Sequence, residues 1–209
     1  MTPKAKDVRP LATLDFLREV YISNLRGGKG RVGAIGKALG APRSSVRSAL
    51  NNASAKGLVS ERGGSAELTS AGRRRLKVVM LGGAFEIIHP GHIHALSEAR
   101  NLGNTLVVVV ATDESVERNK GRPPATGQAL RVALVSALRQ VDLAVPGNKG
   151  SIYEILVRIR PDVVALGYDQ HHNSDSIVRE AAKRGVMVST ARLGSPIPDV
   201  KTSKLLMSL

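Results

Sequence analysis

Apolar residues recur with a helical period in the first third of the chain. Helices are expected over residues 11–25, 31–39 and 44–56, where apolar positions lie three or four residues apart. Two glycines end the first pattern, and a Gly-Ala-Pro turn precedes the third, which Ser44 would cap. Apolar segments on either side of Gly63 and Gly64 then predict a two-stranded hairpin. This is the order of a helix-turn-helix followed by a hairpin.

From residue 76 onward, short apolar runs alternate with helical patterns. Strands are expected over residues 76–81, 105–111, 141–145, 162–166 and 186–189. Helices are expected over residues 91–102, 113–118, 127–140, 150–160, 174–184 and 201–207. Repeated strand and helix units predict an α/β fold, a doubly wound parallel sheet of the Rossmann type, with ligands at the carboxyl ends of its strands. We therefore expect two domains, residues 1–75 and residues 76–209.

Positive charge is concentrated in the first of these domains. The 209 residues include 31 Lys/Arg and 17 Asp/Glu, which gives a net charge of +14. Residues 1–75 hold 15 Lys/Arg and 5 Asp/Glu, so they carry +10 of this charge, and residues 76–209 carry the other +4. Such a distribution is typical of a nucleic-acid-binding module attached to an enzyme.

The composition also limits the kinds of chemistry and the cellular location that are expected for the protein. The chain has no cysteine, so it has no disulfide framework and no thiol chemistry. Its N-terminus lacks a hydrophobic signal core, and its longest aliphatic run, residues 106–111, is too short to cross a membrane. Aromatic residues make up 2% of the chain, which argues against a stacking platform for single-stranded nucleic acid. We expect a cytoplasmic protein without a membrane partner.

The candidate chemistry lies in the stretch VVMLGGAFEIIHPGHIHALSEAR, residues 78–100. An apolar strand runs into two glycines that allow close backbone approach, and a helix follows whose first position suits a proline. His89 then falls near the helix cap and His92 in the first turn. A helix N-terminus attracts anions, and two imidazoles add donors that can follow charge on a phosphate. The stretch predicts an oligophosphate site. A metal site that also includes His94 is the alternative, although zinc usually takes more ligands.

These residues resemble the signature GxFDxxHxGH of the cytidylyltransferase-like nucleotidyltransferase superfamily. In this chain the signature stands as Gly83, Phe85, Glu86, His89, Gly91 and His92. The resemblance implies that nucleotide binding involves Gly82, Gly83, Ala84, Phe85, His89 and His92. It also implies that the two histidines are catalytic. Glu86 stands where relatives carry Asp, and we expect it to be a polar anchor for the substrate.

The resemblance extends to later segments of the second domain. Lys120 is expected to be catalytic and to bind substrate, with Arg122 and Arg131 as further substrate contacts. After the fourth strand, Gly167 and Asp169 would bind the nucleotide and Tyr168 the substrate. A late pair, Thr202 and Ser203, would donate to the triphosphate. His171 and His172 follow in the same loop, but the signature does not require them and we do not count them as catalytic.

The second domain looks most like archaeal FAD synthases. That resemblance implies transfer of AMP from ATP to a phosphorylated acceptor, FMN, with release of pyrophosphate. Mg²⁺ or another divalent cation would be held by phosphates and water, so no protein metal ligands are expected. One alternative is a cytidylyltransferase that uses CTP to form a CDP-alcohol, and an adenylyltransferase for phosphopantetheine or nicotinamide mononucleotide is another. A third is a transcription regulator that uses the same fold as a ligand sensor.

The first domain resembles a winged-helix domain, whose second helix of the helix-turn-helix is the recognition helix. The resemblance implies double-stranded DNA as a partner and a regulatory role for the domain. The expected contacts are Ser45, Arg47, Ser48, Asn51 and Asn52 on that helix and Arg62 near the wing tip. Such domains also serve in protein docking or dimerisation, which is the alternative. A homodimer is expected because helix-turn-helix proteins commonly bind two-fold sites.

Overall fold

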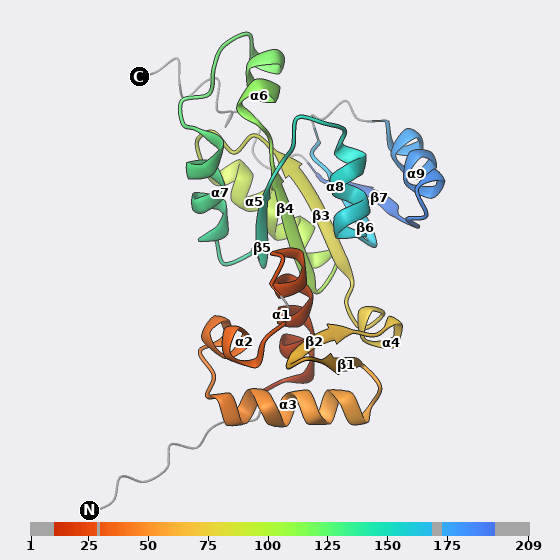
Figure 1. Ribbon diagram of the computed structural model, residues 1–209. Helices are drawn as coiled ribbons and strands as arrows, with labels where there is room; N and C mark the ends of the chain where they lie inside the picture. The colour runs from red at the N-terminus through yellow and green to blue at the C-terminus, as the bar shows by residue number, and fades with distance from the viewer. Residues whose placement is uncertain (1–10, 29, 169–172, 195–209) are drawn as a thin grey trace, which may run out of the picture. The chain divides into compact units, whose positions relative to one another are not determined.

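The computed structural model describes residues 11–28, 30–168 and 173–194 (Figure 1). The chain divides into two compact units, Met1–Leu76 and Lys77–Leu209. Within the described ranges, no helix has the length and the apolar character that crossing a membrane requires.

Unit 1 consists of three helices, a hairpin and a short fourth helix. Its elements are α1 (Thr13–Leu25), α2 (Val32–Leu39), α3 (Arg43–Ala55), β1 (Val59–Arg62), β2 (Ser65–Leu68) and α4 (Ser70–Arg73). The three longer helices bury apolar side chains such as Phe16, Ile35 and Leu50. β1 and β2 pair antiparallel. The two glycines between them have φ of +56° and +74°, as a two-residue type I′ turn requires.

The start of α3 differs from the expected one. The cap position belongs to Pro42, whose extended backbone precedes the first helical residue, Arg43, and no side chain caps the helix. Ser44 therefore lies inside the first turn, and the prediction that it is the N-cap is wrong. Proline suits this position because it has no N–H to satisfy and its fixed φ leads into the helix.

Unit 2 is built on a parallel five-stranded sheet. Its elements are β3 (Val78–Gly83), α5 (Pro90–Asn101), β4 (Thr105–Val110), α6 (Asp113–Lys120), α7 (Gln128–Ser136), β5 (Leu143–Pro146), α8 (Ile152–Ile159), β6 (Val163–Leu166), α9 (Ser174–Lys183) and β7 (Ser189–Arg192). The strand order is β5-β4-β3-β6-β7, and every neighbouring pair is parallel. The chain thus winds outward from β3 in both directions, which is the arrangement of a doubly wound sheet. The predicted doubly wound α/β fold is confirmed.

The core of unit 2 explains why its strands are continuous apolar runs. All six residues of β4 and all four of β6 are buried, because helices cover both faces of the sheet. One core cluster joins side chains of β3 and β4 to α5 and α7, including Leu81, Leu96, Val108 and Val135. The cluster fixes where α5 begins relative to the end of β3, which positions the candidate site.

The last described strand begins later than expected, at Ser189 rather than residue 186. Val186 is buried, but it belongs to the end of α9: its N–H donates to Ala181 O, and the Gly185 N–H donates to Ala182 O. Together with the φ of +70° at Gly185, this is a Schellman ending, in which an apolar residue after the glycine packs back on the helix. The helix expected over residues 201–207 lies outside the described residues.

Candidate functional site

The carboxyl ends of β3 and β6 lie side by side where the strand order reverses. β3 pairs with β4 on one edge and with β6 on the other. After β3 the chain continues to β4 on one side of the sheet, and after β6 it continues to β7 on the other side. Doubly wound sheets bind ligands in the crevice that opens at such a point. Gly82 and Gly83 end β3, and Gly167 and Tyr168 follow β6, so four expected contacts meet at this edge. Three other expected contacts, Asp169, Thr202 and Ser203, lie outside the described residues.

Phe85 supports the turn after β3 from within the core. It has a φ of +50°, in the left-handed region that a bulky residue rarely adopts. Its ring is buried and lies against Gly83, where a Cβ would be 2.7 Å from a ring carbon, so only glycine fits there. The ring centroid is 5.2 Å from that of His92. Phe85 thus packs between the glycine turn and the helix start, with a strained backbone of the kind found at functional sites. Its predicted contact with the nucleotide stays a prediction.

The two signature histidines lie together at the start of α5. Pro90 is the first helical residue and His89 is the cap residue, as expected. The ring centroids of His89 and His92 are 3.9 Å apart, with the planes tilted by 34°. His89 Nδ1 is buried and has no hydrogen-bond partner among the described residues. A buried polar atom of this kind commonly binds a water molecule or a ligand, and a ligand at the helix N-terminus would be such a partner.

The environment keeps His89 neutral. Burial lowers the pKa of His89 below its usual 6.5, and the positive charge of Lys120 lowers it further. Both effects disfavour the imidazolium, so at neutral pH one ring nitrogen is a donor and the other an acceptor. A neutral ring that donates a hydrogen bond can stabilise charge on a phosphate oxygen without carrying charge itself.

His94 lies elsewhere on the helix. Its Nε2 is 3.5 Å from Glu98 Oε2, and its side chain is exposed. Across the described ranges, no group of three or more His, Asp or Glu side chains could hold a metal ion. The alternative metal site at the three histidines therefore has no ligand set in the part of the chain that the structure describes.

Glu86 holds two cations, Lys120 at the end of α6 and Arg122 in the loop after it. The Lys120 ammonium lies 2.6 Å from one carboxylate oxygen, and the Arg122 guanidinium lies 2.6 Å from the other. The Ala125 N–H also donates to this carboxylate, at 2.8 Å. The Glu86 side chain is fully buried, whereas those of Lys120 and Arg122 are 30% and 40% exposed. Glu86 thus organises the two cations, and its predicted contact with the substrate stays a prediction.

These contacts also fix the charge of Glu86. Burial by itself raises the pKa of Glu86, but the hydrogen bonds from Arg122, Lys120 and the Ala125 N–H together outweigh it and lower the pKa to about 2. The same carboxylate raises the pKa of Arg122. Glu86 and Arg122 therefore stay charged at neutral pH. Lys120 and Arg122 remain partly open to solvent, so a phosphate can reach them.

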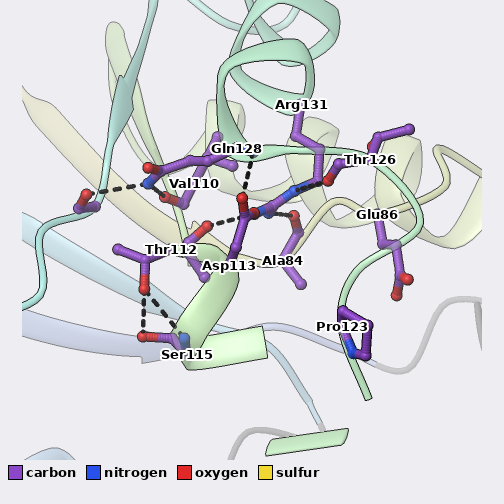
Figure 2. Close-up of polar contacts among 12 residues, drawn as sticks. Ala84, Glu86, Val110, Thr112, Asp113, Ser115, Pro123, Thr126, Gln128 and Arg131 are labelled. Atoms are coloured by element: carbon purple, nitrogen blue, oxygen red, sulfur yellow. Dashed lines mark hydrogen bonds and ion pairs between the residues drawn. The ribbon is translucent and has the colours of Figure 1, made fainter. Parts of the chain in front are cut away.

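Arg131 is the centre of a second polar network (Figure 2). Its guanidinium donates to Thr126 O at 3.0 Å, to Ala111 O at 2.8 Å, to Asp113 Oδ1 at 2.6 Å, and also to Ala84 O. The side chain is completely buried. Arg131 therefore ties the segment after β3 to the segment after β4. All of these partners lie within the protein, and the predicted contact of Arg131 with the substrate stays a prediction.

Two residues that the sequence did not single out as site residues complete this frame. Gln128, the first residue of α7, donates to Val110 O at 2.9 Å and to Gly147 O at 3.0 Å, which links the ends of β4 and β5. Asp113 accepts from Arg131 and from the Gln128 N–H. An acidic residue that opens a helix shortly after a buried strand is the pattern that could have indicated Asp113. Gln128, in contrast, looks like an ordinary first residue of a helix.

The expected DNA contacts lie in unit 1. Arg47, Ser48 and Asn51 are exposed on α3, and Arg62 is exposed at the end of β1 beside the hairpin turn. Ser45 is half-buried. The Arg47 guanidinium lies 2.8 Å from Glu61 Oε1, so this helix and the hairpin are joined by an ion pair.

Comparison with known proteins defines the family of unit 2. The family described as cytidylyltransferase-like matches residues 80–205, which is more than half of the chain. The chain belongs to the cytidylyltransferase-like family. This membership confirms the predicted class of enzyme, a nucleotidyltransferase, and the signature at the start of α5 lies within the matched segment.

Several relatives of this cytidylyltransferase-like chain carry one name. A protein named FAD synthase from Aciduliprofundum boonei is 46% identical over 115 residues, which are 55% of this chain and 76% of that protein. Another protein of that name, from Pyrococcus abyssi, is 41% identical over 139 residues, 65% of this chain and 93% of that protein. Among solved structures, the lipopolysaccharide core biosynthesis protein from Thermoplasma volcanium is 38% identical with a TM-score of 0.55, covering 57% of this chain and 98% of that chain.

Proposed function

We propose that the protein is an FMN adenylyltransferase that makes FAD. A phosphate oxygen of FMN attacks the α-phosphorus of ATP, the bond from that phosphorus to the β-phosphate oxygen breaks, and pyrophosphate leaves. Relatives between 37% and 46% identical to the chain bear the name FAD synthase, which supports ATP and FMN as the substrates. The reaction needs no covalent enzyme intermediate, so catalysis consists of positioning the phosphates and stabilising charge.

The histidine pair at the start of α5 is the observation that carries this proposal. A helix N-terminus offers backbone N–H groups and a positive dipole to the phosphates. His89 and His92 lie within 3.9 Å of each other there, measured between ring centroids, and His89 is held neutral. In the proposal their N–H groups donate to oxygens of the transferred and leaving phosphates, where charge develops in the transition state.

Lys120 and Arg122 supply the positive charge in this proposal. Glu86 orients both cations while their side chains stay partly exposed. A triphosphate or the FMN phosphate would compete with the carboxylate for the same donors, because charge-assisted hydrogen bonds to either acceptor are of similar kind. Gly82, Gly83 and Gly167 would let the nucleotide approach the backbone at the strand ends, and Tyr168 would line the acceptor side.

A divalent cation such as Mg²⁺ is part of the proposal as a companion of the nucleotide. The described residues include no set of three His, Asp or Glu side chains that could hold it, so the donors that fit it are phosphate oxygens and water. Bound in that way, the cation would neutralise phosphate charge. The residues of the chain would still position the substrates and provide the hydrogen-bond donors.

A substrate matrix tests the proposal. ATP and CTP are each combined with FMN, glycerol 3-phosphate, phosphopantetheine and nicotinamide mononucleotide in the presence of Mg²⁺, and both pyrophosphate and the dinucleotide product are measured. Only ATP with FMN should give rapid turnover, with FAD and pyrophosphate in equal amounts. The His92→Asn protein is the control for contaminating activity, and it should be nearly inactive.

The other outcomes separate the alternatives. Turnover with CTP and an alcohol phosphate would make the protein a cytidylyltransferase that forms a CDP-alcohol. Turnover with ATP and a different acceptor would keep the reaction and change the substrate. Tight nucleotide binding without turnover in any combination would favour a ligand sensor and would contradict the enzymatic proposal.

A further inference from the structure

Unit 1 carries a concentration of positive charge that the transfer reaction does not use. Residues 1–75 have a net charge of +10, against +4 for the rest of the chain. The phosphate-binding residues proposed above all belong to unit 2. A separate polyanion is therefore the natural partner for unit 1, and its surface indicates which one.

The exposed face of α3 has the right shape and chemistry for a DNA groove. Val46, Leu50 and Ala53 face the core of unit 1. The opposite face exposes Arg43, Ser44, Arg47, Ser48, Asn51 and Asn52, and α3 contains no acidic residue. With 13 residues, the helix is about 20 Å long, and an α-helix fits the major groove of B-DNA. Arginine and asparagine are the side chains that read guanine and adenine there.

The hairpin extends this face beyond the helix. Arg62 is exposed beside the tight Gly63-Gly64 turn, where it can reach a phosphate next to the groove. A bridge between Arg31 and Ser65 joins the segment before α2 to the hairpin. The hairpin is therefore anchored to the segment before α2 at the strand residue next to its turn, while the two turn glycines remain exposed.

We propose that α3 and the β1–β2 hairpin form a binding surface for double-stranded DNA. In this arrangement α3 enters the major groove, Arg43, Arg47 and Arg62 bind phosphates or guanine edges, and Asn51 reads a base. Single-stranded partners fit less well, because the aromatic residues of the described part of unit 1, Phe16 and Tyr21, are buried and cannot stack on bases. The deep, narrow major groove of duplex RNA does not admit a helix.

Glu61 should weaken non-specific binding of DNA to this surface. It holds Arg47 at 2.8 Å, with the two side chains 35% and 51% exposed. An exposed ion pair contributes little stability, so a DNA phosphate can displace the carboxylate. Until it is displaced, the carboxylate occupies Arg47 and repels the phosphate backbone. Contacts of α3 with a matching base sequence are then needed for a DNA phosphate to replace Glu61 at Arg47. Glu61 therefore favours sequence-specific over non-specific DNA binding.

The test begins with selection from a random duplex pool by the full-length protein. An enriched duplex and a scrambled duplex of equal composition are then titrated by fluorescence anisotropy at several salt concentrations. We expect a two-fold symmetric motif, at least 10³-fold tighter binding of the enriched duplex, and a steep loss of affinity with salt. The symmetry of the motif would indicate a dimer.

Four variants locate the surface. Arg47→Ala should weaken binding about tenfold or more and reduce the salt slope by about one. Asn51→Ala should reduce the preference for the enriched duplex and leave the salt slope unchanged. Glu61→Gln should tighten binding to both duplexes, and the scrambled one more, so that selectivity falls. Arg139→Ala removes an exposed arginine of unit 2 and should change nothing.

The outcomes of this test do not depend on the reaction proposed for unit 2. Thermal unfolding shows whether each variant is folded, and adenylyl transfer, if present, should be unchanged in the unit 1 variants. Failure to enrich any sequence would overturn the proposal, as would equal affinity for both duplexes or equal losses in Arg47→Ala and Arg139→Ala. Binding to vesicles with anionic lipids but not to DNA would also overturn it, since unit 1 would then be a membrane-surface module.

Discussion

The two polar networks of unit 2 use arginine in opposite ways. Arg131 is completely buried, and its partners are three backbone carbonyls and one carboxylate. Arg122 is 40% exposed and shares the single carboxylate of Glu86 with Lys120. Carbonyl groups that belong to the frame cannot leave a buried arginine without unfolding the segment, whereas a cation at the surface can exchange one anion for another. The Arg131 network thus has a structural role, and we call it the frame. The cations of the Glu86 network can exchange the carboxylate for another anion, and we call them the exchangeable charges.

Removal of the buried arginine should have the largest effect on stability of the changes considered. Arg131→Ala would leave buried carbonyls without donors and create a cavity, so we expect the free energy of unfolding to fall by about 3 to 5 kcal/mol. Urea unfolding followed by circular dichroism measures it. Arg139→Ala, at an exposed position shortly after the same helix, is the matched control and should cost less than about 0.5 kcal/mol. Equal costs for the two variants would mean that Arg131 does not hold the frame.

The two signature histidines should respond in rate and not in stability. His92→Asn removes a proposed phosphate donor, and we expect kcat to fall by two or more orders of magnitude, the scale for losing one oxyanion donor. The unfolding midpoint should change little. His94→Asn, on the same helix but exposed beside Glu98, should keep nearly full activity. A kcat for His92→Asn within threefold of the parent would show that the phosphate assignment of this helix is wrong.

The contrast also explains what the sequence could predict. The period of the apolar residues is sufficient to predict the doubly wound sheet. The spacing of His89 and His92 is sufficient to predict where α5 begins. These features depend on local pattern. Arg131 and Arg122 look alike in the sequence, because each is a basic residue near a loop of the same edge. Only long-range contacts distinguish them: Arg131 bonds to Ala84, 47 residues away, and Arg122 to Glu86, 36 residues away.

The Glu86 network should reveal itself in the dependence of stability on pH. The pKa of Glu86 is about 2 in the folded protein, below its ordinary value of 4.5. A lowered carboxyl pKa adds stability that is fully present above about pH 4.5 and is lost as the pH falls toward 2, because the unfolded chain binds the proton more readily. That contribution is on the order of 3 kcal/mol.

Glu86→Gln should therefore be less stable than the parent at pH 7, and the difference should shrink as the pH falls from about 4.5 to about 2. Urea unfolding across this range measures the effect. Glu117→Gln, at an exposed position of α6, should run parallel to the parent at every pH. A constant difference between the parent and Glu86→Gln would contradict the ion pairs with Lys120 and Arg122.

The smallest expected effect is a change in the pKa of His89 when the charge of Lys120 is removed. The charge of Lys120 is the second cause, after burial, of the lowered pKa of His89. Lys120→Met removes the positive charge and leaves the burial, so the pKa of His89 should rise toward 6.5 without reaching it. The ring proton signals of His89, followed by NMR from pH 4 to pH 8, report this pKa. Lys183→Met, at an exposed position of α9, removes the same charge elsewhere and should leave the titration unchanged. If the pKa of His89 is the same in the parent and in Lys120→Met, Lys120 is too far from the histidine pair to share a phosphate with it, and its catalytic assignment fails.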